Sequence, residues 1–162
     1  LLIEMFEKYL KTACHLHIVS HDPQFRRFSD KEGISVISDI THKTLDKLIE
    51  LYQQAHLFVF PTRREPLGIV TIEAMSVGTP VVMTQVGGAM DFVHDGKTGL
   101  VFSLDATAQQ WAQHILDLLN NPEKYQRMSR ACRDYAEKEF DAQSSREKFR
   151  DIIKQLIEKV QG

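Results

Sequence analysis

Two glutamates stand out in the stretch "FPTRREPLGIVTIEAMSVGTPVV", residues 60–82. Glu65 lies in a loop framed by proline and glycine, whereas Glu73 follows among residues that favour a helix. An ionised carboxylate only accepts hydrogen bonds, so it suits the hydroxyl groups of a sugar. The two residues therefore point to a site for a ligand that carries several hydroxyl groups.

The helix between the two glutamates is expected to begin at Gly68. A helix N-terminus has unpaired N–H groups and a partial positive charge, so it can hold a phosphate. Glu65 precedes this point, and Glu73 lies about one turn inside with its side chain leaning back toward the helix start. Carboxylates on both sides of an anion site predict a nucleotide sugar, whose diphosphate has hydroxyls on either side. The alternative to a ligand site is an ordinary solvated loop, with Glu73 on the outer face of the helix. We favour the nucleotide-sugar site.

Short apolar strands alternate with helices along the chain, which predicts an α/β fold: a Rossmann-like parallel sheet with helices on both faces. The length suits one domain over residues 1–162. Ligands of such sheets bind beyond the carboxyl ends of the strands, where the loops 60–68 and 84–91 begin. The strands are expected at 15–20, 34–38, 57–60, 80–84 and 100–102, and the helices at 1–12, 43–54, 68–77 and in three segments after residue 102, one of them starting at Asn121-Pro122.

Composition excludes several other classes of protein. Twenty basic and twenty-two acidic residues give a net charge of −2, which argues against a nucleic-acid binder with a broad basic surface. No apolar run is long enough for a transmembrane segment. Cys14 and Cys132 are expected to be reduced thiols of a cytoplasmic protein. For His15, His17 and His21, core or solvent-edge roles are favoured over a metal site.

The motifs carry a family resemblance. "FPTRREPLGIVTIEAMSVGTPVV", followed by "GGAMDFVHDGKTGLVF", resembles the retaining GT-B glycosyltransferases of family 4. Their pattern is E-P-x-G…E-A-M-x-x-G-x-P-V-V, then a Gly-Gly loop and a DG-x-TG turn. The match is specific over residues 57–102 and looser from residue 1 to about 150. It implies the C-terminal, donor-binding half of a GT-B fold.

The resemblance also assigns roles to residues. It implies that Glu65 is the catalytic-site residue that binds donor-sugar hydroxyls, and that Glu73 binds the ribose. Other donor contacts are implied for Thr62, Arg64, Pro66, Leu67, Gly68, Ile69, Gly87 and Gly88. The nucleobase is implied to rest on Asp39, Ile40 and Thr41, partly through backbone contacts. The pair Arg63-Arg64 has an equally good interpretation as a solvated basic pair.

The implied reaction moves a sugar from a nucleotide diphosphate to a carbohydrate or lipid-linked acceptor, with retention at the anomeric carbon. The family needs no metal, because protein dipoles and basic side chains neutralise the leaving diphosphate. The resemblance implies a hexosyltransferase of polysaccharide or glycoconjugate synthesis, cytoplasmic or peripheral at the inner membrane face.

The chain also departs from the family pattern. The resemblance implies an acceptor-binding N-terminal domain, which is absent here, and a first strand with an Arg/Lys pair, whereas residue 1 already falls in the first helix. A gap is therefore expected between strands 15–20 and 57–60. We expect the chain alone to be inactive and marginally stable, or to fill the gap by strand exchange, oligomerisation or sheet rearrangement. In "IVSHD", Ser20 and His21 replace glycines of the family pattern.

Three other functions are alternatives to a glycosyltransferase. A GT-B half that binds a nucleotide or a partner subunit without catalysis is the first alternative. A GT-B epimerase is less favoured, because the string "EPLGIVTIEAM" is typical of the transferases. An NAD-binding Rossmann domain is weaker still, because no G-x-G-x-x-G follows a strand.

Overall fold

The computed structural model describes residues 1–41 and 44–161. Lys43, the expected first residue of the second helix, lies outside the described residues. The same holds for the side chains of Leu156 and Val160, which helical spacing places on the apolar face of the last helix.

Helices and strands alternate as the sequence predicts. The order is α1 (Leu2–Met5), continued by the π-helical turn η1 (Phe6–Leu10), β1 (Leu16–Val19), the 3-10 helix η2 (Pro23–Phe28), β2 (Ile34–Ile37), α2 (Leu45–Gln54), β3 (Phe58–Phe60), α3 (Ile69–Ser76), β4 (Val81–Thr84), the 3-10 helix η4 (Gly88–Asp91), β5 (Gly99–Phe102), α4 (Ala108–Leu119), α5 (Pro122–Phe140) and α6 (Ala142–Gln161). The expected N-cap of α5 is confirmed, because Asn121 Oδ1 accepts a hydrogen bond from the Lys124 amide at 3.0 Å.

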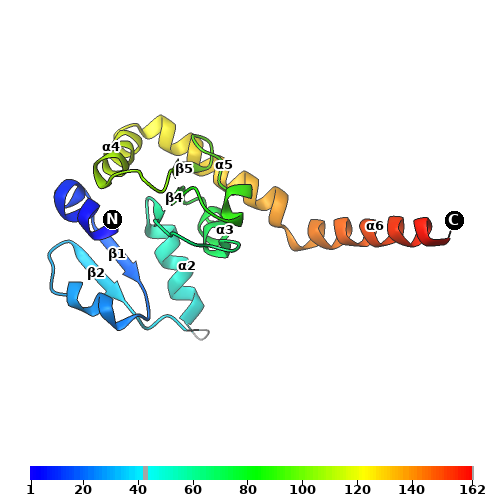
Figure 1. Ribbon diagram of the computed structural model, residues 1–162, viewed down its shortest axis with the longest axis horizontal. Coiled ribbons are helices and arrows are strands. Elements are labelled where there is room, and N and C mark those ends of the chain that lie inside the picture. Colours follow the sequence, from blue (N-terminus) through cyan, green and yellow to red (C-terminus); the bar gives the residue numbers. More distant parts are fainter. Residues whose placement is uncertain (42–43, 162) are drawn as a thin grey trace.

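The strands pair in parallel but form two sheets. One sheet joins β1 to β2 (Figure 1), and the other has the order β3-β4-β5. The division falls between β1 and β3, where the gap was expected. Each of these two strands therefore has an open edge toward the division within the described part of the chain.

Helices cover both faces of the larger sheet. Val82 of β4 belongs to a core cluster with buried residues of α1, η1 and α4, among them Trp111. Val81 and Met83, which alternate with it, belong to a second cluster with residues of α3 and α5. All three β4 side chains are fully buried. Burial on both faces explains why this strand is a continuous apolar run.

The last helix does not pack as its apolar spacing suggested. Helical spacing predicts that Trp111, Met128 and Phe149 all pack in the core. Trp111 and Met128 do lie in the core, but Phe149 is 66% exposed. The reason is geometric: α6 extends away from the domain beyond the end of α5 (Figure 1). The large apolar side chains that are exposed in the described part of α6 include Phe149, Ile152, Ile153 and Ile157. Among the described residues, no helix is both long and apolar enough to cross a membrane.

The open strand edges give a first testable prediction. We expect the 162-residue chain alone to self-associate or to melt over a broad temperature range. The reason is that the backbone N–H and C=O groups at the open edges of β1 and β3 can pair with strands of other molecules. Analytical ultracentrifugation and calorimetric melting measure both properties. A monodisperse monomer with one sharp, cooperative transition would contradict this expectation.

Candidate functional site

The carboxylate of Glu65 binds the backbone at the start of α3. Its Oε1 accepts hydrogen bonds from the amides of Leu67 at 3.2 Å and Gly68 at 2.8 Å. The family resemblance implies that both of these residues contact the donor. In this structure, therefore, the negative charge at the helix N-terminus comes from the chain itself, and it lies where the helix dipole favours an anion.

The loop that contains Glu65 packs directly against the Gly87-Gly88 loop. The Gly88 amide donates a hydrogen bond to the Pro66 carbonyl at 3.1 Å. A Cβ on Gly87 would lie 1.5 Å from the Glu65 carbonyl oxygen, and one on Gly68 would lie 2.5 Å from the Cβ of Ala89. The two loops that the sequence placed at one edge are thus in contact. This contact leaves no room for a side chain at Gly68 or Gly87.

A substitution at Gly87 tests this contact. The change Gly87→Ala combines a φ of +64° with the overlap at Glu65, so it should lower the free energy of unfolding by about 3 kcal/mol. Gly96→Ala is the matched control, because its φ is +72° but no atom lies within 4 Å of an added Cβ. The control should lose only about 1 kcal/mol, the cost of the left-handed backbone. Urea denaturation measures both free energies of unfolding. Equal losses in the Gly87 and Gly96 variants would contradict the contact between the two loops.

Glu73 is half-buried on α3 and faces helix α2. Its Oε2 accepts a hydrogen bond from the hydroxyl of Tyr52 at 3.2 Å. Burial, and then the charge of Glu73, raises the pKa of the Tyr52 phenol, so the hydroxyl remains the donor. Glu73 is therefore partly buried and hydrogen-bonded to α2 rather than fully solvated. Helical spacing places Tyr52 on the apolar face of the helix at residues 43–54, but it does not indicate a hydrogen bond to Glu73.

Thr62 organises the beginning of the same loop. Its Oγ1 donates to the Arg64 carbonyl at 2.9 Å and accepts from the Arg64 amide at 3.3 Å. The side chains of Arg63 and Arg64 are exposed. The apolar side chains of Leu67 and Ile69 are also exposed, by 47% and 57%. The loop thus exposes basic and apolar side chains to solvent, while hydrogen bonds within the loop hold its backbone.

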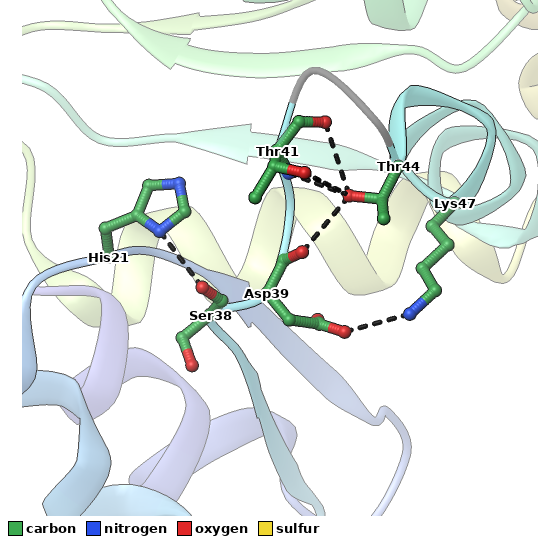
Figure 2. A network of polar contacts seen from close by, with 6 residues as sticks. All are labelled: His21, Ser38, Asp39, Thr41, Thr44 and Lys47. Carbon is green, nitrogen blue, oxygen red and sulfur yellow. Dashed lines mark hydrogen bonds and ion pairs between the residues drawn. The ribbon is translucent and has the colours of Figure 1, made fainter.

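The loop assigned to the nucleobase is held by Thr44 and Lys47 (Figure 2). Thr44 Oγ1 donates to the Asp39 carbonyl at 3.1 Å and accepts from the Thr41 amide at 2.7 Å. Lys47 Nζ donates to Asp39 Oδ2 at 2.9 Å, and this bond holds the pKa of the Asp39 carboxyl below its usual value. Ile40 is buried, so this residue offers its backbone rather than its side chain.

The loop after β1 adjoins the nucleobase loop. His21 Nδ1 hydrogen bonds with the Ser38 carbonyl at 3.0 Å (Figure 2). Ser20 and His21, which depart from the glycines of the family pattern, therefore lie beside residues 38–41. The nucleobase loop leaves β2 and the Glu65 loop leaves β3, so the two loops belong to different sheets.

Two hollows of the described surface lie elsewhere. One of about 260 Å³ is lined by Glu7, Lys11, Lys31, Glu32 and Ile34. The other, of about 550 Å³, lies around the end of β5 and the start of α4, with Asp95, Phe102, Gln110 and His114 among its lining residues. Neither contains a residue of the 62–69 or 87–88 loops.

His15 and His17 of β1 have packing and hydrogen-bond partners within the described part of the chain. His15 and His17 have ring centroids 4.8 Å apart, and His15 hydrogen bonds with Ser35 Oγ at 2.9 Å. The described residues contain no group of three or more potential metal-ligating His, Cys, Asp or Glu side chains. Both cysteines are free thiols. Burial raises the pKa of Cys132 to about 12, so this thiol stays protonated near neutral pH.

Solved structures with the same arrangement define the class of fold. The chain superimposes on sucrose-phosphate synthase from Thermosynechococcus elongatus with a TM-score of 0.75, at 24% identity, over 96% of this chain and 42% of that one. For the Anabaena protein Alr3699/HepE in complex with UDP-glucose, the TM-score is 0.67 at 22% identity, over 82% and 35%. These neighbours are GT-B glycosyltransferases, so the chain has the α/β fold of a GT-B half.

The sequence comparisons give the family. Residues 1–135 match the model of the glycosyl transferases group 1, and the chain belongs to this family. A curated relative is the D-inositol 3-phosphate glycosyltransferase of Corynebacterium urealyticum, 34% identical over 113 residues. That alignment covers 70% of this chain and 24% of the relative. The chain thus spans about a quarter of the length of this relative.

Proposed function

We propose that this chain binds the nucleotide-diphosphate sugar of a retaining glycosyltransferase of family 4. The observation that carries the proposal is the contact between the Glu65 loop and the Gly87-Gly88 loop at the start of α3. It joins a carboxylate, a helix N-terminus and a glycine loop in the segment that matches the family. The Anabaena neighbour, which was solved with UDP-glucose, supports this class of donor.

Glu65 has two successive partners in this proposal. Without donor, its carboxylate occupies the amides of Leu67 and Gly68. A diphosphate that approaches these amides repels the carboxylate, because two anions compete for the same donors. Glu65 then turns to the hydroxyls of the donor sugar, which lies beyond the diphosphate. Glu73 accepts from the ribose on the other side, and residues 39–41 contact the base.

The transfer step uses electrostatics rather than a protein nucleophile. The bond between the anomeric carbon and the phosphate oxygen breaks, and the acceptor oxygen bonds to the same face of that carbon. The acceptor proton passes to the leaving phosphate. The N-terminus of α3 and a basic side chain such as Arg64 stabilise the negative charge of the diphosphate, so we propose that no metal is required.

The acceptor is proposed to bind to a second domain that completes the cleft. The test is to mix this chain with an acceptor domain, or to assay the complete enzyme, against UDP-, GDP- and ADP-sugars. We expect transfer with the anomeric configuration of the donor preserved. Inverted product would refute the retaining mechanism. Donor binding without transfer, even with the acceptor domain present, would favour the non-catalytic alternative.

A further inference from the structure

Tyr52 is fixed by contacts with three neighbouring segments. Its hydroxyl donates to Glu73 Oε2 at 3.2 Å, and its backbone carbonyl accepts from Thr79 Oγ1 at 2.7 Å. Its ring packs edge-on against Phe58 of β3, with centroids 5.5 Å apart at 83°. Only 8% of Tyr52 is exposed. The hydroxyl therefore reaches Glu73 from a ring that has little freedom to move.

The direction of this contact leaves the carboxylate available to a ligand. Tyr52 lies near the C-terminal end of α2, whereas the nucleobase loop precedes the N-terminal end of that helix. In a parallel α/β sheet, the N-terminal ends of the helices lie at the ligand-binding edge. The Tyr52 hydroxyl thus reaches Glu73 from the side opposite the ligand-binding edge of the sheet. The bond engages Oε2, and Oε1, which has no hydrogen bond to another described residue, can accept a hydroxyl.

From this geometry we propose that Tyr52 is a positioning residue, which orients the Glu73 carboxylate to accept the ribose hydroxyls of the donor. The inference rests on the proposed function. A free glutamate side chain samples several rotamers, and a bond to a fixed hydroxyl selects one of them before the ligand arrives. The same bond ties α2, whose first turn anchors the nucleobase loop, to α3. The base and ribose contacts are thereby held by one pair of helices.

The experiment uses Tyr52→Phe in the complete enzyme, which removes the hydroxyl and keeps the ring against Phe58. The probes are the nucleoside diphosphate that binds the wild type most tightly, among UDP, GDP and ADP, and its 2′,3′-dideoxy analogue. We expect about tenfold weaker binding of the ribose form and unchanged binding of the dideoxy form. In a Glu73→Ala background, the same substitution should change neither affinity by more than about twofold.

Tyr135→Phe is the matched control, because its hydroxyl also donates across elements, to the Asp91 carbonyl at 3.1 Å. It should leave the ratio of the two affinities unchanged. Tyr52→p-aminophenylalanine retains a donor at the same place and should restore the ratio, which separates positioning from loss of folding. Equal weakening of both probes, or an effect that persists without Glu73, would overturn the role of Tyr52. If Glu73→Ala itself leaves the ratio unchanged, the proposed role of Glu73 fails instead.

Discussion

Glu65→Gln is expected to reduce kcat/KM for sugar transfer by the complete enzyme roughly 100-fold. The neutral amide binds the donor-sugar hydroxyls less strongly than a carboxylate as charge develops in the transition state. Affinity for the free nucleoside diphosphate should stay equal or rise, because a carboxamide competes less strongly with phosphate for the Leu67 and Gly68 amides. Initial rates with the preferred donor and calorimetry with the free diphosphate measure the two effects.

The control for this prediction is Glu50→Gln, an exposed residue of α2 outside the site. It should retain wild-type rates. If kcat/KM of the Glu65 variant stayed within about threefold of the wild-type value, the proposed role of Glu65 in transfer would be refuted. A parallel loss of free-diphosphate affinity would contradict the exchange of partners at the start of α3.

Glu73→Gln is expected to act mainly on donor binding. Hydrogen bonds to a charged group are worth about 1.5–3 kcal/mol, so the donor KM should rise roughly 30-fold with a smaller change in kcat. Stability should change little, because the amide oxygen can still accept from Tyr52. Steady-state kinetics and thermal melting check both statements. An unchanged donor KM in a normally folded variant would refute the ribose contact.

The sequence predicted the parts of the fold that local pattern determines. Continuous apolar runs such as "PVVMT" marked strands with both faces covered, and β4 is buried on both sides. Asn121 and Pro122 marked the start of α5 correctly. The exposed apolar face of α6 was not predicted, because helical spacing shows that a helix is amphipathic but not what lies against it.

The sequence proposed the residues of the candidate site, but it did not reveal the contacts among them. The loops of Glu65 and Gly87 could be placed together because both follow strands of a parallel sheet. The bond from Tyr52 to Glu73 joins two helices and depends on how they pack, which no local pattern encodes. The use of the Leu67 and Gly68 amides by Glu65 was missed, because a sequence does not show whether an internal carboxylate reaches an anion site first.

The most direct test of the central claim is an NMR titration of the complete enzyme, labelled with ¹⁵N-glycine and ¹⁵N-leucine, against a panel of nucleotide-diphosphate sugars. The proposal requires that a preferred donor shift the amide signals of Leu67, Gly68, Gly87 and Gly88 together and to saturation. It would be contradicted if no donor moved these four signals, or if the largest shift were instead that of Leu100, which lines the hollow of about 550 Å³.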